Sequence, residues 1–329
     1  MQNENIRVLS GDIGGTKTRL AIATVRGNEV HIEHEVSYPS RQYQHFDTLL
    51  AEFLSGVGVP QVAAFGIAGP VQGRVVQTTN LPWQIDADAL QQRFGFSRCL
   101  LLNDLEATAC GLPALGPDDL LTLQAGAPDA CGNQAVIAAG TGLGEAGLFW
   151  DGEQHQPFAT EGGHASFAPS NTLEFALLRH LQQLFGHVSW ERVVSGMGVV
   201  SIHEFLCQYR QTAAPDWLVA EMSTGDAAAA ISNAGLSGGD VICAQTMECF
   251  VKLYGAEAGN LALKTMSRGG LFIGGGIAPK ILPMLQSELF LDAFLAKGRM
   301  RPLLEAMPVR VILNDRAALY GPALRAAQG

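Results

Sequence analysis

The apolar positions near the start of the chain fall into short runs with strand character. Residues 6–10 and 19–25 are mostly apolar, and residues 29–36 alternate between polar and apolar. Runs of this length and period predict two buried strands followed by a half-exposed one. The segment 11–18 between the first two runs is rich in glycine, so it is predicted to be a turn that joins two strands.

The rest of the chain alternates between helical and strand patterns. Apolar residues at 46, 49, 50, 53 and 54 lie on one helical face. The same reasoning predicts helices at 46–54, 86–94, 106–112, 171–185, 198–210, 224–234, 240–266 and 316–327, the last broken at Gly321-Pro322. Further strands are predicted at 62–68, 99–102, 134–139, 145–150, 154–158, 270–274 and 308–313. Strands and helices in alternation are typical of the α/β class.

One unusual unit occurs twice along the chain. Residues 134–158 repeat the opening order of strand, glycine turn, strand, turn and strand. The repeat predicts two duplicated α/β domains that face each other across a cleft, each bringing one glycine turn to a shared ligand. The first domain is predicted at residues 1–110 and is joined by the C-terminal helix at 315–329. The second is predicted at 111–314.

Composition narrows the class of partner. The net charge is −10, and no run of Lys or Arg exceeds two residues, which disfavours nucleic acid and anionic membranes. Six cysteines without a CxxC pair, a polar N-terminus and no apolar run of 18 residues predict a reduced cytosolic protein without a membrane span. The excess of glycine, 38 residues, indicates backbone brought close to a ligand.

The strand at 99–102 ends at Asn103 and Asp104, and this end is the candidate catalytic feature. Ligand crevices of α/β proteins lie at the carboxyl ends of strands, so Asp104 could act as a general base on a substrate hydroxyl. The structural alternative is that Asp104 caps the helix that follows. Taken alone, Asn103 and Asp104 favour the interpretation of Asp104 as a helix cap. The remaining motifs favour its interpretation as a general base.

The glycine-rich segments are candidate phosphate sites. The segment 11–18 leads from strand to strand, which excludes a P-loop and a dinucleotide fingerprint, since both lead into a helix. Converging N–H groups in such a turn can still bind a phosphate, and an ordinary hairpin is the alternative. The segment 140–144 repeats the pattern. The three glycines at 274–276 would admit a flat adenine–ribose unit against bare backbone.

Three further polar or aromatic features are open to two interpretations. Glu161 and His164 flank two glycines and are interpreted as a hydrogen-bonding pair, because Glu-x-x-His without a third ligand is a weak zinc signal. Glu191 is predicted in the first turn of a short helix, where a carboxylate also favours the helix dipole. Trp83, in a predicted loop, could cover a ligand or cover the core.

Together these motifs resemble the bacterial glucokinase family, the ATP-dependent hexokinases of the actin and sugar-kinase superfamily. The residues Gly11-Asp12-Ile13-Gly14-Gly15-Thr16 are similar to its first phosphate motif, and Gly140-Thr141-Gly142-Leu143-Gly144 to its second. The residues Leu271–Gly276 resemble its adenosine motif, and Leu102-Asn103-Asp104 its catalytic strand end. The segments 161–164 and 186–196 resemble its sugar-binding segments. The resemblance covers essentially the whole chain, in order.

The resemblance implies an activity and a set of roles. Glucose would be phosphorylated by ATP to glucose 6-phosphate, with Asp104 as general base on the 6-hydroxyl. The implied sugar ligands are Asn103, Asp104, Glu161, His164 and Glu191. The implied nucleotide ligands are Gly11, Asp12, Ile13, Gly14, Gly15, Thr16, Gly140, Thr141, Gly142, Gly274 and Gly275. Mg²⁺ would bridge ATP oxygens with Asp12 as an outer-shell partner, because Mg²⁺ retains most of its waters. A cytoplasmic homodimer is also implied, without a protein-bound structural metal.

Two departures from the family pattern and three alternatives stay open. Lys17 and Glu145 stand where many members carry an uncharged polar and an apolar residue, and the sequence gives no account of Glu145. A sugar-responsive regulator on the same fold would need an N-terminal DNA-binding segment, for which no room is expected before the strand at 6. An actin-like or chaperone-like ATPase would have no use for the polar set around Asp104. A kinase for fructose, mannose or an N-acetylhexosamine is the runner-up.

Overall fold

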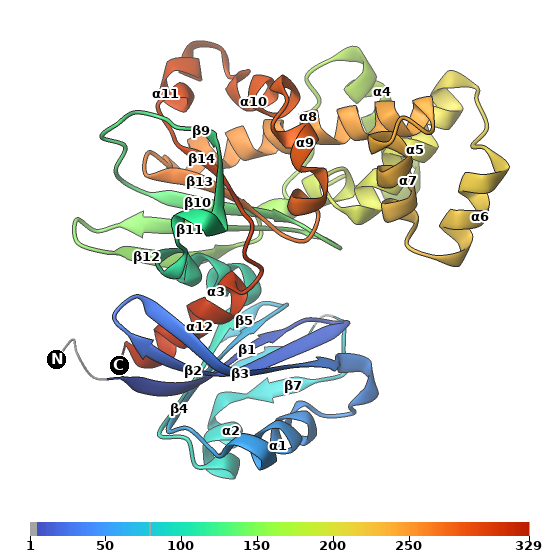
Figure 1. Cartoon of the computed structure of the whole chain (residues 1–329). Coiled ribbons are helices and arrows are strands. Elements are labelled where there is room, and N and C mark those ends of the chain that lie inside the picture. Colours follow the sequence, from blue (N-terminus) through green and yellow to red (C-terminus); the bar gives the residue numbers. More distant parts are fainter. Residues whose placement is uncertain (1–4, 79, 329) are drawn as a thin grey trace. The chain divides into compact units, whose positions relative to one another are not determined.

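The computed structural model describes residues 5–78 and 80–328, and these form two compact units. The first unit holds described residues up to 120 together with 157–159 and 314–328, and the second holds 121–156 and 160–313. Both units combine helices with a main sheet, which confirms the predicted α/β class (Figure 1). No helix within the described residues has the length and hydropathy that crossing a membrane requires.

The first unit is built on a five-stranded sheet in the order β3-β2-β1-β4-β8. Its elements are β1 (Ile6–Ile13), β2 (Lys17–Arg26), β3 (Glu29–Pro39), α1 (Phe46–Val57), β4 (Val62–Ile67), β5 (Val71–Gln72), β6 (Val75–Gln77), β7 (Gln84–Asp86), α2 (Ala87–Phe94), β8 (Arg98–Asn103), α3 (Asp104–Gly111) and α12 (Ala317–Ala327). The strands β1 and β2 form an antiparallel hairpin, whereas β1, β4 and β8 run parallel. Parallel strands place their carboxyl ends at one edge, and this edge carries the predicted motifs.

Aromatic side chains fill the core between this sheet and α1. Phe46 from α1 packs edge-on against Phe65 of β4 and tilted against Trp83, and all three are at most 1% exposed. The indole Nε1 of Trp83 donates to the carbonyl of Tyr43 at 3.0 Å, so its polar atom is satisfied. Of the two interpretations of Trp83, the structure therefore supports the core residue.

The C-terminal helix α12 packs on β1 and α3, although it begins about three hundred residues after β1 and about two hundred residues after α3 (Figure 1). The predicted break at Gly321-Pro322 is wrong, because α12 runs through both residues. Proline removes the N–H that would bond the carbonyl of residue 318. The buried hydroxyl of Ser10 in β1 donates to the next carbonyl, that of Leu319, at 2.5 Å. Packing on β1 and α3 therefore keeps the helix continuous where its own hydrogen bonding is incomplete.

The second unit is built on a six-stranded sheet in the order β12-β11-β10-β13-β14-β9. Its strands are β9 (Leu120–Gln124), β10 (Gln134–Ala139), β11 (Leu143–Trp150), β12 (His155–Thr160), β13 (Gly270–Gly274) and β14 (Val309–Ile312). Its helices are α4 (Thr172–Phe185), α5 (Gly196–Arg210), α6 (Asp216–Thr224), α7 (Ala227–Leu236), α8 (Val241–Thr265), α9 (Leu282–Leu285), α10 (Glu288–Leu295) and α11 (Arg301–Glu305). As in the first unit, an antiparallel hairpin continues into parallel strands, here β10, β13 and β14.

The 25-residue helix α8 is the centre of the second unit's core. It packs on α5, α7, α10 and β10. Its fully buried Tyr254 donates its hydroxyl to the carbonyl of Ile137 at 3.3 Å and accepts the N–H of Ala139 at 3.2 Å. These bonds fix α8 against the end of β10, where the second glycine turn begins. The helix α6 was not predicted, and the helix predicted at 224–234 begins three residues later, with Asp226 as its N-cap.

Candidate active site

The first unit brings two predicted motifs to one edge of its sheet. In the parallel register Ile13 of β1 pairs with Ile67 of β4, and Ile67 pairs with Asn103 of β8. The first glycine turn and the Asn103-Asp104 strand end therefore leave the sheet at the same edge, with β4 between them. This is the edge at which α/β proteins bind ligands.

Asn103 is the N-cap of α3, a role that the sequence assigned to Asp104 as its alternative. Its Oδ1 accepts the N–H groups of Leu105 at 3.0 Å and Glu106 at 3.4 Å, and Glu106 Oε2 accepts the N–H of Asn103 at 3.4 Å. This reciprocal capping box satisfies N–H groups that the helix cannot pair. The amide nitrogen of Asn103 donates to the carbonyl of Gly69 at 3.3 Å. Three of these contacts involve the Asn103 side chain and hold it in one orientation.

Asp104 is the first residue of α3 and is half-buried. Its Oδ1 accepts the N–H of Leu105 at 2.9 Å, and its carbonyl accepts the hydroxyl of Thr108 at 3.1 Å. A carboxylate in the first turn of a helix is stabilised by the helix dipole. A carboxylate held in this way can act as a general base on a hydroxyl within hydrogen-bond reach.

The first glycine turn is tied down by Ser40. The N–H of Gly14 donates to the carbonyl of Lys17 at 3.0 Å and closes the hairpin. The Ser40 hydroxyl donates to the carbonyl of Gly14 at 2.7 Å, and its N–H donates to the carbonyl of Thr16 at 3.0 Å. These bonds engage the carbonyls of Gly14, Thr16 and Lys17 within the protein. A glycine turn whose carbonyls are occupied in this way is compatible with a phosphate ligand.

Two members of this motif have structural reasons to be where they are. A Cβ on Gly11 would lie 2.6 Å from Phe65 Cδ1 and 2.9 Å from Leu20 Cδ2, so glycine is needed for core packing there. Ile13 is 1% exposed and its side chain belongs to the core of the first unit. The backbone at Gly14, Gly15 and Thr16 forms the exposed or half-exposed part of the motif.

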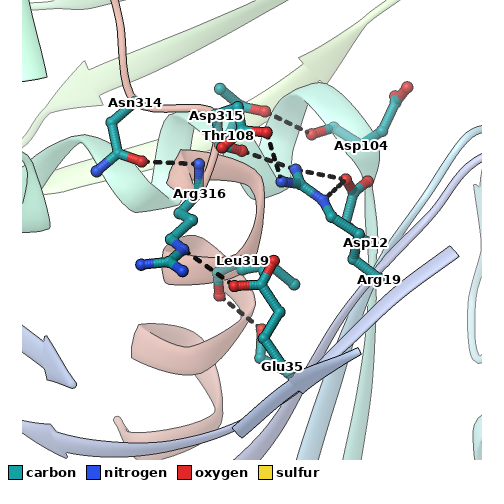
Figure 2. A network of polar contacts seen from close by, with 10 residues as sticks. Asp12, Arg19, Glu35, Asp104, Thr108, Asn314, Asp315, Arg316 and Leu319 are labelled. Atoms are coloured by element: carbon teal, nitrogen blue, oxygen red, sulfur yellow. Dashed lines mark hydrogen bonds and ion pairs between the residues drawn. The ribbon is translucent and has the colours of Figure 1, made fainter. Parts of the chain in front are cut away.

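An ionic network that the sequence did not predict holds Asp12 (Figure 2). The guanidinium of Arg19 donates to Asp12 Oδ2 through Nη2 at 2.9 Å and through Nε at 3.2 Å. It also donates to Oδ2 of Asp315 at 2.9 Å and to the carbonyl of Asp315 at 2.7 Å. Burial alone would lower the pKa of Arg19, but the charges of Asp12 and Asp315 raise it above its ordinary value. The sequence feature that could have indicated this network is Arg19 itself, a charged residue within a mostly apolar strand.

The second unit joins its glycine turn to Glu191. The turn closes with the N–H of Gly140 donating to the carbonyl of Gly142 at 2.9 Å. Oε2 of Glu191 accepts the N–H of Leu143 at 3.0 Å, and it occupies the space that a Cβ on Gly142 would need. Glu191 lies in the short 3₁₀ turn Trp190–Arg192. A predicted sugar ligand and the predicted second phosphate motif are therefore in direct contact.

The turn that carries Glu161 and His164 lies next to both. It is a 3₁₀ turn, Gly162–His164, closed by the N–H of His164 donating to the carbonyl of Glu161 at 3.0 Å. The two side chains are exposed, with His164 Nε2 and Glu161 Oε2 3.9 Å apart. The N–H of Trp190 donates to the carbonyl of Ala165 at 3.0 Å and ties this turn to the segment that carries Glu191. The structure thus gathers Glu161, His164, Glu191 and the second glycine turn.

The predicted adenosine segment follows β13 at the same edge of its sheet. Gly274 ends β13 and pairs with Ala138 of β10, so Gly275 lies beside Ala139, which directly precedes the second glycine turn. Gly275 adopts a φ of +82°, and a Cβ there would overlap with the carbonyl of Ala139. A Cβ on Gly276 would meet no atom within 4 Å, so that side of the segment is open.

Glu145, which the sequence left unexplained, is a buried carboxyl in β11. It is 2% exposed and lies behind Gly162, where a Cβ would overlap with its Oε2. Burial and the neighbouring Glu257 raise the pKa of Glu145 to about 8. The side chain therefore points into the protein below the Glu161–His164 turn.

Among the residues that the structure describes, one group of metal-ligand types occurs in the second unit, away from these segments. Ligand atoms of His203, Asp240 and Cys243 lie within 4.8 Å of one another. Asp240 Oδ1 already accepts the N–H of Cys243 at 2.8 Å as the N-cap of α8. Burial and Asp240 raise the pKa of the Cys243 thiol to about 12, so it stays protonated. These contacts account for the cluster as a helix cap, and we assign no metal to it.

Comparison with known proteins places the chain in a family. The glucokinase family model matches residues 9–329. A glucokinase of Trichormus variabilis is 44% identical over 339 aligned residues, which cover 98% of this chain and 99% of that one. The aligned region therefore extends over both units.

Solved structures agree with this assignment. The crystal structure of a glucokinase from an Antarctic psychrotroph is 32% identical, covers 98% of this chain and 99% of its own, and superposes with a TM-score of 0.86. A ROK family glucokinase from Streptomyces griseus, solved with glucose and AMPPNP, shares the fold at 22% identity with a TM-score of 0.63, covering 98% and 100% of the two chains. The chain therefore belongs to the glucokinase family, and it is an enzyme that phosphorylates glucose with ATP.

Proposed function

We propose that Asp104 is the general base that takes the proton from the 6-hydroxyl of glucose as the γ-phosphoryl group is transferred. The observation that carries the proposal is the shared sheet edge, at which the first glycine turn and Asp104 emerge one strand apart. Phosphoryl transfer needs an aligned nucleophile and neutralised charge. Asp104 is oriented by the N-terminus of α3, and a base in this position contributes about 10²–10⁴ in rate.

The sugar ligands in this proposal are Asn103, Asp104, Glu161, His164 and Glu191. A hexose presents hydroxyls that both donate and accept, and carboxylates and an imidazole meet them in pairs. Three of the five lie together in the second unit, which supports a common ligand. Asn103 contributes through its amide nitrogen, because its oxygen already accepts two backbone N–H groups.

The nucleotide ligands are the backbones of the two glycine turns and of the adenosine segment. These are residues Gly11 to Thr16, Gly140 to Gly142, and Gly274 with Gly275. Mg²⁺, when bound, neutralises charge on the ATP phosphates. Asp12 fits an outer-shell role toward it, because Arg19 engages only Oδ2 among the contacts of the described residues and carboxylate oxygens suit Mg²⁺.

Family membership supports three further parts of the proposal. We place the enzyme in the cytoplasm as a homodimer. Residues 1–110 with 315–329, and residues 111–314, serve as its two functional domains. The contacts of α12 with β1 and α3 support the inclusion of the C-terminal helix in the first of these.

The sugar assignment is tested by glucose affinity. Glu161→Ala should raise the dissociation constant for glucose by tenfold or more, since hydrogen bonds to a charged group contribute about 1.5–3 kcal/mol each. Glu153→Ala, at an exposed turn of the same unit, is the matched control and should bind as the unaltered enzyme does. Unchanged glucose affinity in Glu161→Ala would remove Glu161 from the site. A coupled assay of ATP consumption over a panel of hexoses then identifies the preferred sugar.

A further inference from the structure

Glu145 is a buried acid with no part in the mechanism proposed above. It lies in β11, opposite Ile137 of β10, directly after the second glycine turn. Its side chain is enclosed, and Oε1 has no hydrogen-bond partner among the described residues. Burying a carboxyl oxygen without a hydrogen-bond partner is costly, so a position of this kind needs an explanation.

The residue touches the turn of Glu161 and His164 through both its side chain and its backbone. Its Oε2 fills the space in which any side chain at Gly162 would begin. Its carbonyl accepts the hydroxyl of Thr160 at 3.0 Å, and the same Thr160 oxygen accepts the N–H of Gly162 at 3.2 Å. Gly162 therefore packs against the side chain of Glu145, and the hydroxyl of Thr160 links the N–H of Gly162 to the carbonyl of Glu145.

The charges around Glu145 favour its neutral form. Glu257 of α8, fully buried, has its two oxygens engaged by Asn260 at 2.7 Å and by the ammonium of Lys264 at 3.2 Å. With these donors Glu257 is the member of the pair that carries the charge. Within the described part of the chain no such donor reaches Glu145, and it keeps its proton, which allows the two carboxyls to lie close together.

The other ionisable groups nearby do not reverse this assignment. The phenol of Tyr254, from α8, is buried, and its pKa is raised by burial to a region far above neutrality. The ammonium of Lys297, which precedes α11, donates to the carbonyl of Ala256 and to Asn260 and so supports Glu257 rather than Glu145. Among these groups Glu145 is the carboxyl whose pKa is raised, by burial and by its neighbour Glu257.

We propose that neutral Glu145 is a positioning residue for glucose binding. It holds Gly162 in place so that Glu161 and His164 contact the sugar, and its ionisation displaces this turn. The proposal rests on the sugar-binding role proposed for those two residues. An ionised Glu145 would lie beside charged Glu257 without a hydrogen-bond donor of its own. The repulsion between the two carboxylates could then be lowered only by entry of water or by movement at Gly162. Glucose affinity should therefore fall as Glu145 loses its proton.

The test is the dissociation constant for glucose, measured by calorimetry without ATP between pH 7 and pH 9. With a pKa of about 8, the neutral fraction falls about tenfold over this range, so affinity should weaken by up to about tenfold. Glu145→Gln keeps the shape without the titration, and its affinity should stay near the pH 7 value throughout. Glu153→Gln, at an exposed position, should behave as the unaltered enzyme does. Turnover at saturating glucose should be unchanged by Glu145→Gln, since the residue touches no reacting atom.

A compensating pair tests the contact itself. Gly162→Ala should weaken glucose binding, because its Cβ overlaps with the Glu145 carboxyl. Adding Glu145→Ala to that variant opens the space and should restore part of the lost affinity. A pH dependence that persists in Glu145→Gln, or no gain in the double variant over Gly162→Ala, would overturn the proposal. If Glu161→Ala also binds glucose normally, the sugar assignment has failed; if Glu161→Ala binds weakly, only the role of Glu145 has.

Discussion

Arg19 offers the most quantitative test of how the first unit holds its phosphate motif. Its side chain is 10% exposed and makes four hydrogen bonds, two to Asp12 and two to Asp315. Arg19→Met keeps much of the length and volume but removes every donor. Asp12 is then left without its partner in a site where its side chain is 26% exposed.

The expected loss of stability follows from these exposures. Breaking a buried ion pair by removing one member costs about 3–5 kcal/mol. The contribution of the Asp315 carboxylate is small, because at 82% exposure a pair of this kind is worth at most about 1 kcal/mol. Water reaches Asp12 in part and reduces its penalty. We therefore expect Arg19→Met to lower the free energy of unfolding by about 3 kcal/mol, and Asp315→Asn, the matched control, by less than about 1 kcal/mol.

The assay combines urea denaturation with steady-state kinetics. In the function proposed above Asp12 lies in the outer shell of Mg²⁺ and Arg19 orients it, and loss of an orienting partner of a metal-site carboxylate typically costs 10–100-fold in affinity or activity. The KM for MgATP should therefore rise or turnover fall by that factor in Arg19→Met, while the glucose dissociation constant stays the same. Unfolding within 0.5 kcal/mol of the unaltered enzyme together with normal ATP kinetics would refute this reasoning.

Two other predictions concern stability. Gly321→Ala in α12 should destabilise the enzyme by several kcal/mol, since its Cβ would overlap with the carbonyl of Ala107 in α3. Gly56→Ala in α1 is the control and should be neutral or stabilising, because a Cβ there meets nothing within 4 Å. Thermal melts of the two variants compare them directly. The pKa of Glu145 is about 8 in the folded protein against an ordinary 4.5, so the free energy of unfolding should decline by about 3 kcal/mol as pH rises from 5 to 8. Glu145→Gln should remove that decline. Equal pH profiles of the unaltered enzyme and Glu145→Gln in urea denaturation would contradict the assignment.

The sequence predicted what depends on local pattern. Strand ends at Asn103 and glycine turns at 14–16 and 140–142 carry their signals in neighbouring residues, and the repeated unit predicted the two similar sheets. The resemblance to glucokinases rested on these same segments, and the family assignment is confirmed.

What the sequence missed depends on contacts between distant segments. Arg19 meets Asp315, 296 positions later, and Ser10 meets Leu319 across 309 positions. The latter contact and the packing on α3 keep α12 helical through Pro322, against local propensity. Glu145 is explained only when Gly162 and Glu257 are placed around it, and neither is near it in sequence. Long-range packing of this kind leaves no pattern in one chain.

The central claim is that Asp104 is the base, and single-turnover phosphoryl transfer in Asp104→Asn tests it most directly. Asparagine keeps the shape at the start of α3 and an oxygen for the N–H of Leu105, at a cost of about 0.3–1 kcal/mol from the lost charge at the helix dipole. With glucose and MgATP saturating, the rate should fall by about 10²–10⁴ while glucose still binds. A rate within a few-fold of the unaltered enzyme would contradict the account.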